Sequence, residues 1–120
     1  MQKAADKKTI NRILDANINR AKEGLRVCEE ITRFTLNNHR LTSCFKKIRH
    51  DLNIIVKKTF KAESLLESRR SLCDIGKNIY VNELKRSDTK DIFFANIQRA
   101  KESLRVLEEF SKLTTKENCA

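Results

Sequence analysis

Hydrophobic residues recur every three or four positions along most of the chain, which is the spacing of helices that bury one face. In the middle of the chain, this apolar face consists of Leu41, Phe45, Ile48, Leu52, Ile55 and Phe60. Asn37 and Asn38 precede it and mark a break, because Asn is common where a helix stops. The pattern therefore predicts three long helices, at residues 9–36, 41–60 and 88–113.

The pattern weakens between residues 61 and 90. Gly76 can adopt a positive φ without steric cost, and Asp74 can hydrogen-bond to nearby backbone. We therefore expect a structured loop at residues 74–76, followed by a short helix, with Ser87 and Asp88 as candidate N-caps of the last helix. Because long loops in compact domains often carry function, the loop is a candidate functional segment.

Composition favours an all-α helical bundle. The chain has no Pro and two Gly, so the turn residues of a many-stranded sheet are missing. Its length suits one helical domain over residues 1–120, with an ordered core at about 9–114. No apolar run reaches the ~18 residues of a membrane span and no signal peptide is evident, so we expect a soluble, cytoplasmic protein. The four cysteines show no CxxC pairing and are expected to be reduced.

The formal net charge of +10 raises the question of nucleic-acid binding. Basic and acidic residues alternate along the predicted helices, and the basic doublets are short, which is typical of a solvated helix surface. We expect neither a nucleic-acid nor a membrane partner, whereas a small anionic ligand suits the charge. The sequence contains no glycine-rich phosphate loop, hydrolase elbow or zinc-ligand spacing, so any active site must consist of side chains.

Two segments of the chain are nearly identical. Residues 16–30 (ANINRAKEGLRVCEE) and 95–109 (ANIQRAKESLRVLEE) begin 79 residues apart and agree at twelve of fifteen positions. The first and last helices are therefore expected to be related by an internal repeat. On a helical wheel each wide apolar arc contains two polar residues, Asn17 with Arg20 and Asn96 with Arg99.

These polar residues permit two interpretations. Arg can bind a phosphate through two N–H groups, and Asn can donate and accept, so the two helices could form an anion-binding cavity. Small residues at Gly24 and Ser103 would admit either a ligand or another backbone. Alternatively, Arg and Asn form a buried network with Glu23 and Glu102 that fixes helix register. The sequence is compatible with both interpretations.

Several strings together resemble one known family. They are RILDANINRAKEGLRV at 12–27, IRHDL at 48–52, Arg69, DIG at 74–76 and the segment 95–110. Their order over residues 12–113 is similar to that of a short all-helical domain of thiamine biosynthesis. That domain is often fused ahead of thiamine-phosphate synthase and is assigned as an alternative hydroxymethylpyrimidine phosphate kinase.

The resemblance implies phosphoryl transfer from ATP to hydroxymethylpyrimidine phosphate, with Mg²⁺, to give the pyrophosphate that the synthase consumes. Arginines would hold the phosphates, asparagines would orient the pyrimidine, and aspartates would bind metal or accept a proton. The implied catalytic residues are Asp51 and Asp74. The implied substrate-binding residues are Asn17, Arg20, Glu23, Arg49, Arg69, Asn96 and Arg99, and the metal ligands stay unassigned.

Two features depart from the family pattern. Arg69 is followed by Arg70 where the family has Asp, which removes a carboxylate from the expected loop. The chain ends at Ala120, so we expect its product to reach a separate synthase. The alternatives to a kinase are a non-catalytic helical domain that binds a ligand or docks on thiamine-phosphate synthase, and a basic nucleic-acid-binding protein. A homo-oligomer could complete the cavity with residues of a second copy.

Overall fold

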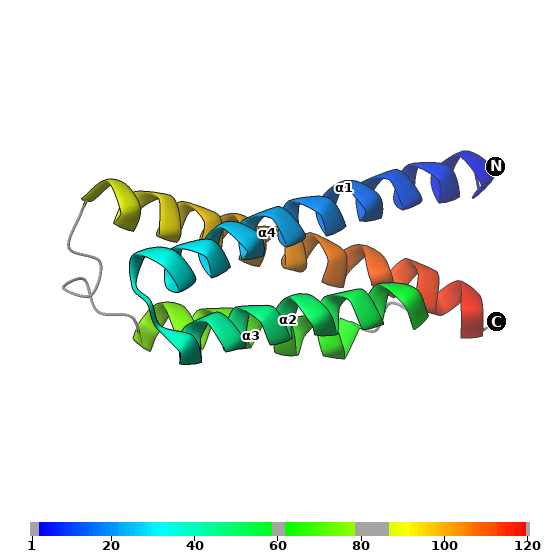
Figure 1. The fold of residues 1–120 in the computed structure, drawn as a ribbon. Coiled ribbons are helices and arrows are strands. Elements are labelled where there is room, and N and C mark those ends of the chain that lie inside the picture. Colours follow the sequence, from blue (N-terminus) through cyan, green and yellow to red (C-terminus); the bar gives the residue numbers. More distant parts are fainter. Residues whose placement is uncertain (1–2, 59–61, 79–86, 120) are drawn as a thin grey trace.

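In the part of the chain that the structure describes, four α-helices run antiparallel to their neighbours (Figure 1). The computed structural model describes residues 3–58, 62–78 and 87–119, and of the side chains those of 7–58, 63–77 and 89–113. The regular elements are α1 (Lys3–Glu30), the π-helix η1 (Ile31–Thr35), α2 (His39–Lys58), α3 (Ala62–Asn78) and α4 (Ser87–Cys119). All regular structure in these ranges is helical, which confirms the all-α prediction.

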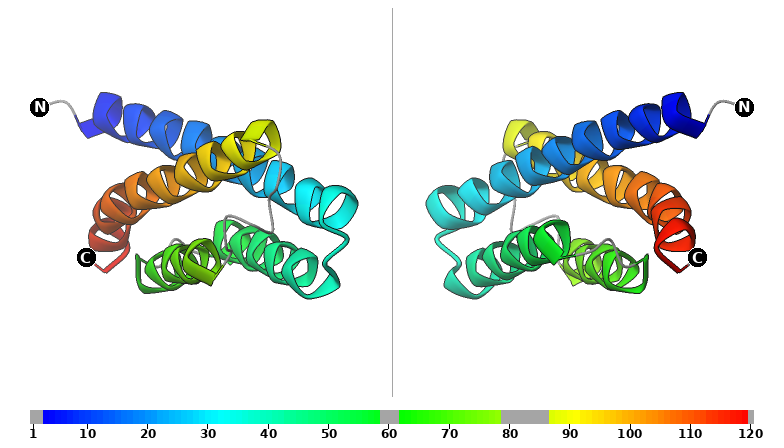
Figure 2. Two further views of the ribbon diagram at one scale, coloured as in Figure 1. Left: turned by 90° about the vertical axis from the view of Figure 1, so that its left-hand side faces the viewer. Right: turned by 90° about the vertical axis from the view of Figure 1, so that its right-hand side faces the viewer.

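The helices lie in two layers. Figure 2 shows α1 crossing α4 in one layer, with α2 and α3 side by side in the other. Each helix packs on its neighbours in sequence, and α4 returns to pack on α1, as in an up-down-up-down bundle. The bundle is elongated, with principal extents of 54 × 22 × 19 Å. The two nearly identical segments therefore meet in one layer.

The core lies between the two layers and follows the predicted spacing. Phe45 of α2 meets Phe93 of α4 edge to face, with ring centroids 5.9 Å apart, a favoured geometry for aromatic pairs. The buried apolar residues of α2 are Leu41, Phe45, Ile48 and Leu52, all of which were predicted from the pattern. On α1 they are Leu14, Ile18, Ala21, Leu25 and Cys28, and on α4 Phe93, Ile97, Ala100, Leu104 and Leu107.

Gly24 sets the distance between α1 and α4. A Cβ atom at this position would lie 2.8 Å from the carbonyl oxygen of Asn96 and 3.4 Å from the Cβ atom of Ala100. Real Cβ atoms do not approach a carbonyl oxygen so closely, so any larger residue would push the helices apart. The sequence left open whether this small residue admits a ligand or another backbone. The structure shows that the backbone of α4 approaches it.

The turn between α1 and α2 is where the sequence predicted it. Asn37 has a φ of 51°, a left-handed conformation that Asn tolerates better than most residues. The side chain of Asn38 caps α2, because its Oδ1 accepts the backbone N–H of Leu41 at 3.0 Å. The hydroxyl groups of Thr32 and Thr42 are 3.0 Å apart and join the two sides of the turn.

The prediction of a loop at residues 74–76 is wrong. These residues lie inside α3, and Gly76 has no positive φ there. Leu65, Leu72 and Ile75 give α3 a buried face, and its polar residues had concealed the spacing of these few apolar positions. The short helix expected after the loop lies outside the described residues, and α4 begins at Ser87, within the predicted boundary region.

Two further expectations concern cysteines and membranes. Cys28, Cys44 and Cys73 are free thiols, as predicted for these three, and the side chain of Cys119 lies outside the described residues. Among the described residues, no helix is both long enough and apolar enough to cross a membrane.

Candidate functional site

A cavity of about 570 Å³ opens where α1 crosses α4. We call it the crossing cavity. It is lined by Asn17 and Arg20 of α1 and by Ala95, Gln98, Arg99, Glu102, Ser103 and Val106 of α4. Three of the four polar residues that the sequence singled out in the apolar arcs therefore line one cavity.

Arg20 and Arg99 are its cationic groups. Both residues are exposed, and neither forms an ion pair with any residue that the structure describes. Guanidinium groups are well suited to phosphate because two N–H groups can bind two oxygens at once. Two such groups without carboxylate partners in one cavity make it a candidate site for an anion.

Asn17 supplies a hydrogen-bond acceptor at the cavity wall. The residue is 6% exposed, and its Nδ2 donates to the backbone oxygen of Ile13 at 2.8 Å. Within the described part of the chain its Oδ1 has no donor, so this oxygen is available to a ligand N–H group. Asn96 makes the same bond to the oxygen of Ile92, at 2.8 Å, but it does not line the crossing cavity.

Arg49 has a different environment from Arg20, although the family resemblance assigns both to the substrate. Its Nε and Nη2 donate to Glu29 of α1 at 3.0 and 3.3 Å. The side chain of Glu29 is only 3% exposed, so the ion pair satisfies a buried carboxylate and joins α2 to α1. Arg49 is thus engaged in holding two helices together.

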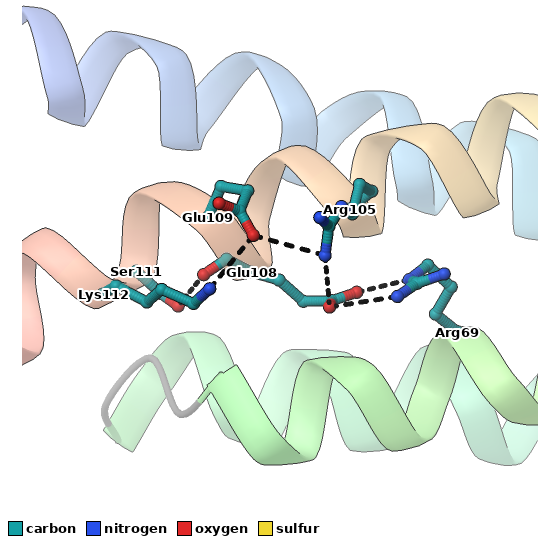
Figure 3. Close-up of polar contacts among 6 residues, drawn as sticks. All are labelled: Arg69, Arg105, Glu108, Glu109, Ser111 and Lys112. Atoms are coloured by element: carbon teal, nitrogen blue, oxygen red, sulfur yellow. Dashed lines mark hydrogen bonds and ion pairs between the residues drawn. The ribbon is translucent and has the colours of Figure 1, made fainter.

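Arg69 makes the equivalent contact between α3 and α4, with Glu108 (Figure 3). Its Nε donates to one carboxylate oxygen, and its Nη2 donates to the other at 3.2 Å. The hydrogen bond to Glu108 raises the pKa of Arg69, so this guanidinium stays charged throughout the accessible pH range. Arg105 approaches the same carboxylate at 3.6 Å from the solvent side.

Asp51 and Asp74 lie elsewhere, in a groove between α2 and α3. They share this groove with Lys47, whose Nζ lies 3.0 Å from a carboxylate oxygen of Asp51. The structure therefore brings the two predicted catalytic aspartates together but does not bring them to the crossing cavity. Glu23 is exposed on α1 and lines neither cavity.

Three of the residues at these sites, Gln98, Glu29 and Glu108, were not assigned roles from sequence, and Glu102 was named only as part of the alternative network that fixes helix register. Gln98 and Glu102 line the crossing cavity, where the Nε2 of Gln98 donates to Glu102 at 3.1 Å. Glu29 and Glu108 are the buried partners of Arg49 and Arg69. The sequence contains a signal for these two glutamates. Glu29 follows Leu25 by four residues and Glu108 follows Leu104 by four, which places each glutamate on the buried helix face.

The described residues contain no group of three or more His, Cys, Asp or Glu that could hold a metal ion by itself. A Mg²⁺ ion that arrives with a nucleotide needs fewer protein ligands, because phosphate oxygens and water complete its coordination. Glu102 is the carboxylate that lines the crossing cavity and is the residue there suited to that ion.

A comparison with protein families identifies the chain. The model described as the ThiD2 family matches residues 12–120. The chain belongs to the ThiD2 family. The ThiD2 match includes α1 from Arg12 onward, the whole of α4 and both arginines of the crossing cavity.

Curated relatives of this ThiD2 chain are longer proteins. It is 39% identical over 117 residues to thiamine-phosphate synthase of Rhodopirellula baltica, covering 97% of this chain and 31% of the relative. It is 41% identical over 105 residues to thiamine-phosphate synthase of Synechocystis sp., covering 87% and 29%. For the enzyme of Nostoc punctiforme the identity is 40% over 113 residues, covering 93% and 31%. The chain thus spans less than a third of the length of these relatives, and no solved structure gives a significant match.

Proposed function

We propose that this ThiD2 domain acts in thiamine biosynthesis and transfers a phosphoryl group from ATP to hydroxymethylpyrimidine phosphate. The observation that carries the proposal is that Arg20 and Arg99 line one cavity and that neither guanidinium group has an ion-pair partner among the described residues. The name of the relatives, thiamine-phosphate synthase, supports the pathway. The kinase reaction itself comes from the family resemblance of the sequence.

The kinase reaction suits a site that is lined by positively charged side chains. An oxygen of the substrate phosphate attacks the γ-phosphorus of ATP, a new P–O–P bond forms, and the bond from the γ-phosphorus to the bridging oxygen breaks. ADP leaves with the electron pair of that bond. The attacking phosphate oxygen is already deprotonated near neutral pH, so the step requires no general base. What it requires is alignment of two polyanions and neutralisation of their charge.

Arg20 and Arg99 supply this neutralisation from opposite sides of the crossing. One residue belongs to α1 and the other to α4, so the rigid packing around Gly24 fixes the position of both backbones. Asn17 would orient the pyrimidine, because its free Oδ1 accepts an N–H group of the ring substituents. Ser103, which is buried in the cavity wall, leaves space for the ligand beside Arg99.

Mg²⁺ would enter this site with the nucleotide. Glu102 would hold it together with the phosphate oxygens, and the ion would supply further neutralisation of negative charge. The hydrogen bond from Gln98 keeps the Glu102 side chain at the cavity.

The remaining residues implied by the resemblance stay predictions. Because no base is needed, Asp51 and Asp74 are not required for the transfer in the crossing cavity. Arg49 and Arg69 contribute by fixing α2 and α3 to the crossing helices through their ion pairs. Asn96 and Glu23 stand beside the cavity residues in sequence, and their contact with substrate is an expectation from the family pattern.

A non-catalytic role is the second candidate. The relatives are named as synthases and extend well beyond the region that this chain matches, so the domain could bind a ligand for, or dock on, thiamine-phosphate synthase. Such a domain would bind the pyrimidine phosphate without converting it.

Phosphorus NMR distinguishes the two candidates. We expect the protein to convert hydroxymethylpyrimidine phosphate, with ATP and Mg²⁺, to the diphosphate and ADP. Arg20→Ala and Arg99→Ala should each lower kcat/KM about 10- to 100-fold, the effect of one charge-assisted contact. Arg40→Ala, which removes an exposed arginine of α2 outside both cavities, is the control. Binding of the substrate without formation of the diphosphate would support the non-catalytic role and contradict the kinase.

A further inference from the structure

The two nearly identical segments, residues 16–30 of α1 and 95–109 of α4, also agree in burial. Side chains at equivalent positions are alike in being buried, half-buried or exposed at thirteen of the fifteen positions. Arg20 and Arg99 are both exposed, for example, and Val27 and Val106 are both half-buried. The two helices therefore turn the same face to solvent and the same face to the second layer.

Hydrogen bonds and ion pairs repeat in the same way. The side-chain nitrogens of Asn17 and Asn96 each donate to the backbone oxygen four residues earlier, at 2.8 Å. The buried carboxylates of Glu29 and Glu108 each bind one arginine of the second layer. Because α1 and α4 are antiparallel and cross in one layer (Figure 2), this repetition indicates an approximate two-fold axis through the crossing.

The crossing cavity uses only one side of this arrangement. Six of its lining residues belong to α4 and two to α1. The equivalents of the six, 79 positions earlier, lie on α1 with nearly the same chemistry, and they are Ala16, Asn19, Arg20, Glu23, Gly24 and Val27. The axis therefore predicts a second surface across the crossing. We call it the α1 face, and it consists of Asn19, Glu23, Val27 and Asn96.

Arg20 and Arg99 belong to both surfaces. Each is the equivalent of the other, both line the crossing cavity, and neither has an ion-pair partner among the described residues. A half-turn about the axis exchanges the two arginines and leaves the pair in place. The proposed reaction requires two phosphorylated substrates whose phosphates meet, and a guanidinium pair between two binding surfaces provides that meeting point.

The α1 face is the more open of the two surfaces. Asn96 is half-buried, whereas its equivalent Asn17 in the crossing cavity is only 6% exposed. Asn19 also has a shorter side chain than its equivalent Gln98. ATP is the larger of the two substrates, so the α1 face suits ATP and the crossing cavity suits the pyrimidine phosphate.

We propose that the α1 face binds the nucleoside part of ATP and that the γ-phosphate reaches the acceptor phosphate between Arg20 and Arg99. This inference rests on the proposed kinase function and assigns its two substrates to two related surfaces. Glu23 accepts hydrogen bonds from ribose hydroxyl groups. The Oδ1 atom of Asn96, which has no donor in the described part of the chain, accepts an N–H group of the base, and Val27 contacts the ring.

Equivalent residues provide a matched pair of variants. Asn96→Ala should raise KM for ATP about tenfold, the effect of one hydrogen bond, and leave KM for the pyrimidine phosphate unchanged. Asn17→Ala should do the reverse, because it alters the crossing cavity alone.

A second pair of variants compares two exposed glutamates of α1. Glu23→Ala removes the acceptor for the ribose and should raise KM for ATP about tenfold. Glu30→Ala, outside the α1 face, should leave KM for both substrates unchanged. Circular dichroism verifies the fold of each variant, and Glu23→Ala keeps the test valid if an asparagine variant does not fold.

NMR locates the two ligands directly. With Mg²⁺ present, the non-hydrolysable ATP analogue AMP-PNP should shift the backbone amide signals of residues 16–27. Hydroxymethylpyrimidine phosphate should shift mainly those of residues 95–106. Signals of Arg20 and Arg99 should respond to both ligands, because the phosphates of both reach this pair.

The outcomes separate this inference from the kinase function itself. If the diphosphate forms but Asn96→Ala and Glu23→Ala leave KM for ATP unchanged, the assignment of the α1 face is overturned and the kinase function stands. The assignment is also overturned if Asn17→Ala raises KM for ATP as much as Asn96→Ala does. If no diphosphate forms although AMP-PNP shifts residues 16–27, the kinase function fails, and nucleotide binding to the α1 face is supported.

Discussion

Glu108 of α4 is held by Arg69 of α3 through both oxygens of its carboxylate, and 79 residues earlier Glu29 of α1 is held by Arg49 of α2 in the same way. Each glutamate belongs to one of the two nearly identical segments. Each ion pair therefore fixes one helix of the second layer to one helix of the crossing. Just after each segment, the hydroxyl of the residue three positions beyond the glutamate, Thr32 or Ser111, donates to the backbone oxygen of that glutamate.

Removal of one cation should destabilise the bundle. Arg69→Met leaves the carboxylate of Glu108, 5% exposed, without its main partner. Loss of one member of a buried pair costs about 3–5 kcal/mol, and we expect about 2–3 kcal/mol here because Arg105 still approaches Glu108. Urea unfolding measures this loss in the free energy of unfolding.

The control for this change is the double variant Arg69→Met with Glu108→Leu. Replacement of a whole buried ion pair by apolar residues is often close to neutral, so the double variant should recover most of the stability. If the loss in free energy of unfolding for the double variant equals the sum of the losses for the two single variants, the ion pair itself is not the source of the effect.

Substitution by alanine should change the stability of the protein in opposite directions at Gly24 and Gly76. Gly24→Ala places a Cβ atom 2.8 Å from the backbone oxygen of Asn96, and the overpacking should outweigh the gain in helix propensity by about 1–2 kcal/mol. Gly76→Ala meets no atom within 4 Å inside a helix, so it should stabilise by about 0.5–1 kcal/mol. Thermal unfolding of the two variants measures both effects, and equal shifts in Tm would contradict this account of the crossing.

Much of the fold could be predicted from spacing, and the failures have physical causes. The middle helix was predicted at 41–60 and is found at His39–Lys58, because its four buried residues recur at strict helical spacing. The helix α3 was missed because its buried residues are few and its sequence is rich in Ser and Arg. Gly76 was read as a turn residue, but within a helix it costs only about 1 kcal/mol, which tertiary packing can outweigh.

The candidate site was predictable in part. The placement of Asn17, Arg20 and Arg99 in one cavity follows from a helix crossing between the two similar segments. The contrast between free and paired arginines could not be predicted, because it depends on which glutamate of each segment faces the other layer. The family resemblance gave Arg49 and Arg69 the same standing as Arg20, whereas the packing of α2 and α3 brings them to Glu29 and Glu108.

Cys28 should be an inert thiol. Burial raises its pKa from 9.0 to about 12, because the thiolate would lose its hydration in the core, where its Sγ lies 3.6 Å from the backbone oxygen of Phe93. At about pH 8, iodoacetamide should label the half-buried Cys44 and Cys73 much faster than Cys28, as measured by mass spectrometry of peptides.

The raised pKa of Cys28 also makes the stability of the fold depend on pH. The folded state keeps the proton of Cys28 at pH values where the unfolded chain releases it, so this contribution to stability is complete below pH 9.0 and declines as the pH rises toward about 12. Urea unfolding of the wild type and of Cys28→Ala along this pH range should show a steeper decline for the wild type. Parallel declines would contradict the burial of this thiol.

The most direct test of the crossing cavity is calorimetry with hydroxymethylpyrimidine phosphate. Wild-type protein and Arg40→Ala should bind it with the same affinity, and the double variant Arg20→Ala with Arg99→Ala should bind it at least about 100-fold more weakly while its unfolding free energy stays within about 0.5 kcal/mol. The unphosphorylated alcohol should show little difference between these proteins at the crossing cavity. Equal affinity of the wild type and the double variant for the phosphate would contradict the assignment of the Arg20 and Arg99 guanidinium groups to the substrate.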